Sequence, residues 1–208
     1  RCELIDSIYE GFRPEVKDQI NFLVRSMADG MVWSTEAFSS QGGVLLDEEQ
    51  LATYCRNVIG YPALFTLSQV SDRELTQGAR EDAFLVSEMI QLANVSRDVE
   101  RDLQRGISYH PELRPYLGES GYEGESRVAV NRVREQYMAM ALSRVPAYRR
   151  LFEGLNLGGT PPVRIASILM LLFTDLHYRT TALRTGNSFC PVPRGTVQVV
   201  AASLPSLM

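Results

Sequence analysis

The sequence predicts an all-α protein. Along several long segments, apolar residues recur at spacings of three and four, which is the pattern of helices that bury one face. The sequence shows no internal repeat, and no pair of alternating runs joined by a tight turn, which would indicate a β-hairpin. With 208 residues, of which 45% are hydrophobic, the chain is long enough to bury one sizeable core.

The first long helix is predicted from its starting residue and its apolar pattern. After a short apolar pattern over residues 2–11, Pro14 suits the first turn of a helix that runs to about residue 38. Gly30, inside this helix, allows a neighbouring element to approach closely. A glycine-containing turn over 41–43 follows the helix.

A shorter helical region should come next. Asp47 is expected to be an N-cap, because Gln50 stands at the third position of the helix predicted over 48–59. Gly60-Tyr61-Pro62 should kink or interrupt that helix, and a further helical segment is predicted over 63–70.

A long helix is predicted over 79–105, and Gly106 stands where a left-handed glycine commonly closes a helix. Its apolar residues recur at the spacing of a buried stripe: Leu85, Met89, Leu92, Val99 and Leu103.

The polar face of this helix holds the densest group of functional side chains in the sequence. Asp98 and Asp102 are four residues apart, so they lie about 40° apart on one face, with a rise of roughly 6 Å between them. Gln91 and Asn94 fall on the same face, which borders the apolar stripe. Two carboxylates at this spacing repel each other, so we expect a positive group beside them.

Two kinds of positive group are compatible with the residues. A Mg²⁺ ion takes one or two carboxylates and completes its coordination shell with water and phosphate oxygens. Alternatively, Arg101 and Arg105 follow the two aspartates by three residues and could pair with them on a solvated face. The residues alone leave both interpretations open.

The second half of the chain should hold two more helices. Residues 107–124 contain five prolines and glycines, so we expect no regular element there but a flap over the acidic helix. An amphipathic helix is predicted over 126–152, bent or split by Pro146. The helix predicted over 163–183 carries an apolar run that is too short to span a bilayer.

Two units are therefore expected. Residues 1–185 should form a helical domain, and residues 186–208, rich in helix-breaking proline and glycine, an extended tail that could contact protein partners. Because the chain begins at Arg1, we expect a processed product or a fragment, in which any targeting segment is no longer visible.

Composition excludes several classes of protein. A formal net charge of −4 argues against a general nucleic-acid-binding protein. Three widely spaced cysteines give no disulfide framework and favour a reducing, intracellular compartment. Two histidines and no paired cysteines leave little from which to build a zinc site.

Three stretches carry motifs in the order and spacing of a known family: Met27-Ala28-Asp29-Gly30-Met31, Tyr54-Cys55-Arg56-Asn57-Val58-Ile59-Gly60, and the run Gln91-Leu92-Ala93-Asn94-Val95-Ser96-Arg97-Asp98 with Asp102, Arg105-Gly106 and Tyr109-His110-Pro111 after it. Together they resemble the squalene/phytoene synthase family, the head-to-head prenyltransferases. The last run resembles the family's second acidic motif, and the resemblance covers roughly residues 12–184.

The resemblance implies an isoprenoid-synthase-type helical bundle around a central cavity. In the family, two acidic motifs hold Mg²⁺ ions that grip prenyl diphosphates, because a diphosphate leaves only when its growing charge is neutralised. The implied cofactor is thus Mg²⁺, and the implied partners are prenyl diphosphates or a prenyl lipid. The implied site residues are Asp98 and Asp102 for catalysis and metal, and Gln91, Asn94, Arg97, Tyr54 and Tyr109 for the substrate and its diphosphate.

The chain also departs from the family. No counterpart of the first acidic motif precedes residue 1, so the bundle is expected to be amino-terminally truncated, and Arg101 stands where the family often has Glu. As given, the chain is not expected to run the reaction alone.

Three functions therefore stay open at this point. The first is a prenyltransferase whose missing helices lie elsewhere. The second is a catalytically silent family member that serves as a structural subunit or assembly factor of a larger organellar complex, mitochondrial or plastid. The third is a prenyl-lipid-binding module that keeps the cavity but has lost turnover. For the chain as a whole, peripheral contact with a membrane also stays open.

Overall fold

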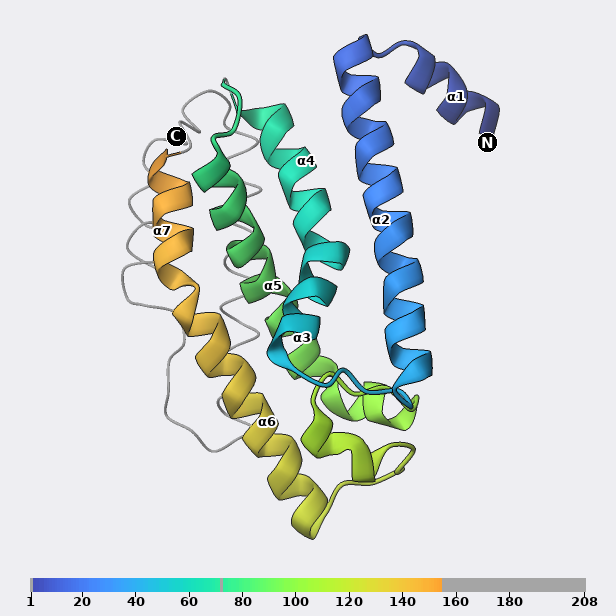
Figure 1. Cartoon of the computed structure of the whole chain (residues 1–208), viewed down its shortest axis with the longest axis vertical. Helices are drawn as coiled ribbons and strands as arrows, with labels where there is room; N and C mark the ends of the chain where they lie inside the picture. Colours follow the sequence, from blue (N-terminus) through green and yellow to red (C-terminus); the bar gives the residue numbers. More distant parts are fainter. Residues whose placement is uncertain (1, 72, 155–208) are drawn as a thin grey trace, which may run out of the picture.

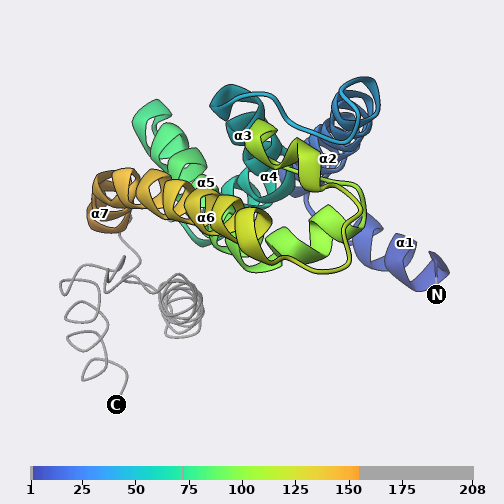
Figure 2. The same cartoon turned by 90° about the horizontal axis from the view of Figure 1, so that it is seen from below.

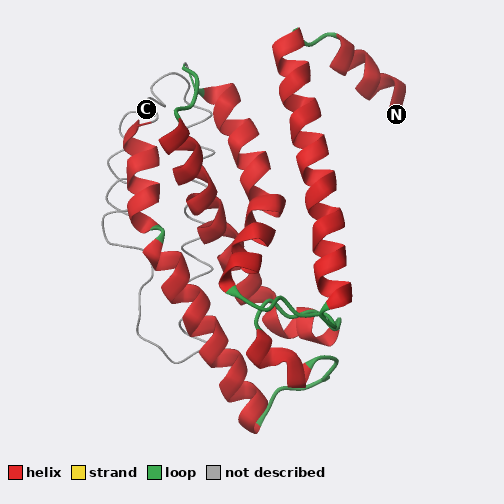
Figure 3. Cartoon of the chain, in the orientation of Figure 1, coloured by secondary structure: helices red, strands yellow, loops and turns green. Residues whose placement is uncertain are grey.

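The computed structural model describes residues 2–71 and 73–154, which are helical throughout apart from their connections (Figure 3). The all-α prediction is confirmed, and no strand occurs within these residues. The elements are α1 (Cys2–Glu10), α2 (Pro14–Ser40), α3 (Glu48–Cys55), a π-helical turn η1 (Arg56–Gly60), α4 (Tyr61–Val70), α5 (Gln77–Gln104), a 3-10 turn η2 (Pro111–Tyr116), α6 (Gly124–Ser143) and α7 (Val145–Gly154).

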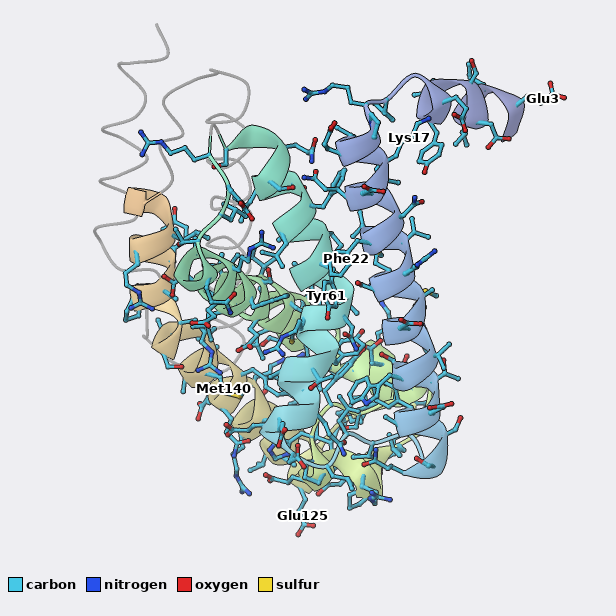
Figure 4. All side chains as sticks on the ribbon, turned by 45° about the horizontal axis from the view of Figure 1, so that its top comes forward. Glu3, Lys17, Phe22, Tyr61, Glu125 and Met140 are labelled. Carbon is cyan, nitrogen blue, oxygen red and sulfur yellow. The ribbon has the colours of Figure 1, made fainter. Side chains whose placement is uncertain are left out.

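The helices lie side by side, with α5 between α4 and the α6–α7 pair (Figure 1). Helix α2 packs on the other side of α4, where the rings of Phe22 and Tyr61 meet edge to face with their centroids 6.0 Å apart (Figure 4). Helix α1 projects away from the body at the amino-terminal end of α2 (Figure 2). It is tied to α2 by the 2.6 Å contact between Lys17 and Glu10.

The predicted starts of α2 and α3 are confirmed, but α3 ends at Cys55, and the rest of the helix predicted over 48–59 is the π-helical turn η1. Asp47 caps α3, since its Oδ1 accepts the Gln50 backbone N–H at 2.8 Å. Gly60-Tyr61-Pro62 does not interrupt the helix, because η1 carries the chain continuously from α3 into α4. Pro62 is tolerated there since it stands in the first turn of α4.

The close approach predicted at Gly30 is confirmed. A Cβ atom at this position would lie 2.6 Å from the Cβ of Asn57 in η1, so only glycine lets α2 and η1 meet at this distance.

Helix α5 is the core helix of the described residues. Its predicted apolar stripe is buried from Met89 to Leu103. It packs mainly against the buried side of α6, formed by Val130, Val133, Tyr137, Met138 and Ala141. Pro146 splits the long helix predicted over 126–152 into α6 and α7, as expected.

Charged pairs also join α5 to α6 and α7, and sequence reasoning missed them. They are Glu100 with Arg134, Glu88 with Arg144 at 2.8 Å, and Asp82 with Arg150 at 2.6 Å. Residue numbers rise along α5 as they fall along its partners, which is the register of antiparallel neighbours. Because a buried charge without a partner is strongly unfavourable, these pairs help to fix that register.

The segment after α5 is anchored and partly regular. Gly106 closes α5 at φ 76°, and the backbone N–H of Ile107 reaches back to the Asp102 carbonyl at 2.9 Å. Ser108 then pairs with the α2–α3 connection, donating to the Gly43 carbonyl at 2.8 Å and accepting from Leu45 at 3.0 Å. The expectation of no regular element over 107–124 was wrong for η2, which starts at a proline and needs only local hydrogen bonds.

No described helix is both long and apolar enough to cross a membrane. The helix predicted over 163–183 and the tail predicted over 186–208 lie outside the described residues, so the division at residue 185 stays a prediction.

We expect Gly43→Ala to destabilise the fold by more than a strained turn alone. Gly43 has φ 84°, and a Cβ there would lie 2.1 Å from the Gly106 carbonyl oxygen. Gly118→Ala is the matched control, because its φ is 80° but no described atom lies within 4 Å of the place that its Cβ would take. Urea unfolding should give a loss of about 1–2 kcal/mol for Gly118→Ala and at least about 3 kcal/mol for Gly43→Ala. Equal losses would contradict the close approach.

We expect Arg134→Met to lower the free energy of unfolding by about 1–3 kcal/mol, since Glu100 loses its buried partner and keeps only the more exposed Arg127, 3.3 Å away. Arg134 is 1% exposed and also donates to the Ser96 carbonyl at 3.0 Å. The double variant Glu100→Leu/Arg134→Met should recover part of the loss in the same urea experiment, because the half-buried carboxylate is gone and Arg127, 51% exposed, stays solvated. Additive losses from the two single variants would contradict this coupling.

Candidate functional site

The two predicted aspartates lie at the carboxyl end of α5, at the border between core and surface. Their side chains are 18% exposed at Asp98 and 16% exposed at Asp102, so neither points into bulk solvent. Val99 and Leu103, their neighbours on α5, are buried. The burial follows from the sequence, because the polar face adjoins the apolar stripe on the same helix.

Both aspartates contact arginines of their own helix. The Arg97 guanidinium grips Asp98 with two nitrogens, Nε lying 2.9 Å from Oδ1. Arg101 lies 3.6 Å from Asp98, and Arg105 lies 4.0 Å from Asp102. The contacts that the ion-pair interpretation requires are therefore present, and the ligand role of the aspartates stays a prediction.

The electrostatic environment of Asp102 disfavours its charge. Burial raises the pKa of the Asp102 carboxyl, and the neighbouring Asp98 carboxylate raises it further. Arg105, Arg101 and the Tyr109 hydroxyl act in the opposite direction and offset only part of the effect. Because burial is the largest cause, the raised pKa reflects lost hydration of the Asp102 carboxylate more than a surplus of negative charge.

The two amides of the predicted face, Asn94 and Gln91, lie about one and two turns before Asp98. Gln91 is buried and accepts a hydrogen bond through Oε1 from Asn94 Nδ2 at 3.1 Å. This bond fixes which atom of Gln91 accepts, and it leaves the Asn94 amide oxygen for other partners. An amide oxygen is a suitable ligand for a hard cation or for an ordered water.

Two tyrosines close the face from outside α5. Tyr54 on α3 and Tyr109 after α5 share a hydrogen bond between their hydroxyls at 3.2 Å, and Phe38 on α2 meets both rings edge to face at 6.1 and 5.7 Å. Burial raises the pKa of both tyrosines, so their hydroxyls stay protonated at neutral pH. The Asp102 carboxylate adds a smaller contribution to the raised pKa of each tyrosine.

The fold thus brings together the residues that the sequence singled out from three different elements. Asp47 caps the helix that carries Tyr54, and the Ser108 backbone pairing holds the neighbouring Tyr109. Sequence reasoning missed Phe38, which it placed only on a helix, and the packing of that ring on both tyrosines. The signal available was weak, because nothing in the spacing of α2 indicates a partner near residue 109.

The donor groups fit a divalent cation only in part. Within residues 2–71 and 73–154, no cluster of three or more His, Cys, Asp or Glu side chains could hold a metal. Two carboxylates and an amide oxygen are hard donors, and they suit Mg²⁺ that draws its remaining ligands from water and phosphate. The residues therefore fit a substrate-completed Mg²⁺ site and not a protein-only cage.

The described residues also outline a cavity of about 600 Å³, but it lies at the other end of α5. It is lined by the α4–α5 connection and by the first turns of α5 and the end of α7, with Arg73, Asp82 and Arg150 among its polar groups. The central cavity beside the aspartates, which the resemblance implies, stays a prediction.

Comparison with known proteins gives a family. The geometry defines an all-α protein in which tyrosines cover the acidic face of one core helix. A sequence profile of the squalene/phytoene synthase family matches residues 13–175. The chain belongs to the squalene/phytoene synthase family.

Individual relatives cover less of the chain. Two squalene synthase sequences of Candida albicans, one of them from strain SC5314, are each 29% identical to it over 112 residues. The match covers 50% of this chain and 25% of each relative, so the chain spans about a quarter of the length of the relatives it matches. No solved structure matches the chain.

We expect Asp102→Asn to become progressively more stable than the wild type as pH rises. The pKa of Asp102 is raised in the folded protein, so the native state binds the proton more tightly than the unfolded chain. The loss of stability caused by an ionised Asp102 is absent at a pH below its pKa in both the unfolded and the folded state. It is fully present above the raised pKa of the folded state. Urea unfolding between about pH 4 and pH 8 should show the stability gap widening with pH.

Carbon-detected NMR titration of the Asp102 carboxyl gives a second check. Asp98→Asn should lower the pKa of Asp102, because it removes a like charge that raises it. A stability gap that does not change with pH, or an Asp102 titration unmoved by Asp98→Asn, would contradict the assigned causes.

Proposed function

We propose that this chain is part of a head-to-head prenyltransferase, which condenses two prenyl diphosphates. The observation that carries the proposal is the convergence of the motif residues from α3, α5 and the segment after α5 on one face. Family membership supports the reaction class, and the squalene synthase relatives support a prenyl diphosphate substrate.

In this proposal, Asp98 and Asp102 hold Mg²⁺, with Asn94 and Gln91 supporting the ion or its water. Bound Mg²⁺ would neutralise the charge that develops on a departing diphosphate. Arg97 orients Asp98 through its two-nitrogen contact, and it adds a positive charge beside the leaving group. The burial of both aspartates supports these roles, because charges interact more strongly where water is scarce.

The tyrosines have a different role in the proposal. Tyr54 and Tyr109, packed against Phe38, place three aromatic rings beside the acidic face. Their hydroxyls can orient the diphosphate, and the rings exclude water, which would otherwise quench a carbocation. The raised pKa values of Tyr54 and Tyr109 keep both hydroxyls as hydrogen-bond donors at neutral pH.

A second candidate is a catalytically silent family member that serves as a structural subunit or assembly factor. The observation that favours it is that both aspartates are already paired with arginines of α5. In that case Asp98 and Asp102 are structural, and the arginines are their permanent partners. A mitochondrial or plastid complex and a role for the tail in binding partners belong to this candidate.

Turnover by the full-length protein separates the two candidates. With farnesyl diphosphate and Mg²⁺, the enzyme should release pyrophosphate, and Asp98→Ala should lower the rate by about 10²–10³-fold, because it removes charge stabilisation at the leaving group. Asp18→Ala, on the exposed side of α2, is the control and should keep the wild-type rate.

The outcomes assign the function. Pyrophosphate release that depends on Asp98 supports the enzyme. A wild-type protein that stays folded by circular dichroism but releases no pyrophosphate overturns the enzyme and supports the silent subunit. Normal release by Asp98→Ala would contradict the role assigned to that aspartate.

A further inference from the structure

Three arginines form a row beside the acidic face. Arg97 and Arg101 lie on α5 and Arg105 is its C-cap residue, and the three recur every four residues, so they follow one side of the helix. Their side chains are 43%, 63% and 67% exposed, whereas the carboxylates of Asp98 and Asp102 are mostly buried. The carboxylates are therefore held in place, while the guanidinium groups of Arg101 and Arg105 can turn on flexible stems.

The contacts within the row differ in strength. Arg97 grips Asp98 with two nitrogens, which is the strongest arrangement available to a guanidinium. Arg101 and Arg105 make longer contacts, at 3.6 and 4.0 Å, and exposed ion pairs at such distances are weak. A stronger anion can therefore displace these two from the aspartates.

The balance of charge in this row favours an anion. The three guanidinium groups outnumber the two carboxylates that they contact, so a divalent cation that approaches alone meets a net positive charge. A diphosphate is attracted instead, and guanidinium groups bind phosphate oxygens through paired hydrogen bonds.

We propose that Arg101 and Arg105 are displaceable counter-ions of Asp98 and Asp102, so that this face takes up a diphosphate and a divalent cation cooperatively. This inference rests on the proposed function, since it concerns the same diphosphate site. When the two arginines turn to the diphosphate, the aspartates lose these partners and become available to the cation. By linkage, the cation strengthens diphosphate binding by the same factor.

The asymmetry of the ion pairs also assigns an order to the two aspartates. Asp102 is paired with Arg105 at 4.0 Å, whereas Asp98 is held by both Arg97 and Arg101. Asp102 is therefore the first of the two to be freed, and Asp98 follows when Arg101 leaves it. Arg97 stays as the group that keeps Asp98 oriented.

The test compares separate and joint binding in the full-length protein. Manganese alone is followed by electron paramagnetic resonance. Inorganic pyrophosphate alone, with chelator present, and preformed manganese pyrophosphate are followed by calorimetry. The variant is Arg101→Gln, which keeps much of the side chain's polar character and removes its charge. The matched control is Arg132→Gln on α6, because Arg132 is similarly exposed and forms a 2.6 Å ion pair with Glu112.

For Arg101→Gln we expect opposite changes in the two separate affinities. Manganese alone should bind about fivefold more tightly, because a competing guanidinium is gone, and pyrophosphate alone about fivefold more weakly. The cooperativity between the two ligands should shrink accordingly. Arg132→Gln should match the wild type in all three titrations.

The remaining outcomes overturn the inference in distinguishable ways. If the wild type binds manganese pyrophosphate but Arg101→Gln leaves both separate affinities unchanged, or weakens both, the counter-ion role is wrong and the proposed function stands. If the wild type does not bind manganese pyrophosphate at all, the proposed function and this inference fail together.

Discussion

Two carboxylates held one turn apart at the edge of an apolar core repel each other, and the surroundings of α5 limit that repulsion in two ways. The arginines of the same helix supply positive charge from the solvent side, at Arg97, Arg101 and Arg105. From the core side, the hydroxyl of Tyr109 acts to lower the raised pKa of Asp102. Burial raises the pKa of Asp102 more than the neighbouring carboxylate does, so the position of α5 at the edge of the core, and not repulsion alone, sets the electrostatics of this face.

The rest of the described structure holds α5 in the position that this face requires. Buried apolar residues and three charged pairs fix α5 against α6 and α7. On the other side, the pairing of Ser108 with Gly43 and Leu45 ties the end of α5 to the α2–α3 connection. The second attachment holds Tyr109 near Tyr54 on α3, although the two residues are 55 positions apart in the sequence.

Local patterns in the sequence predicted the elements well, and contacts between elements poorly. The apolar spacing from Leu85 to Leu103 was sufficient to find α5, and Asp47 with Gln50 was sufficient to find the start of α3. Both signals depend on residues within one or two helical turns of each other. The π-helical turn was taken for a break, because Gly60 and Pro62 usually end helices and nothing local indicates continuation.

For the candidate site, too, the sequence predicted relations within one helix but not contacts between elements. Spacing alone placed Gln91, Asn94, Asp98 and Asp102 on one face, and it identified Arg101 and Arg105 as candidate partners of the aspartates. It could not pair Arg134 with Glu100, because a buried arginine on α6 has several possible acidic neighbours until the register of the two helices is known. Nor could it predict the packing of Phe38 on two tyrosines from other elements.

The turn η1 joins α3 and α4 into one continuous helical segment. It therefore sets how the side chains of α3 are rotated about the helix axis relative to those of α4. On one side of it, Tyr54 faces Tyr109, and on the other, Tyr61 meets Phe22 and Phe84. Each residue of an α-helix advances the side chains by about 100°, so a segment one residue shorter would swing Tyr54 away while Tyr61 kept its place. The number of residues from α3 to α4 therefore determines whether Tyr54 points toward Tyr109.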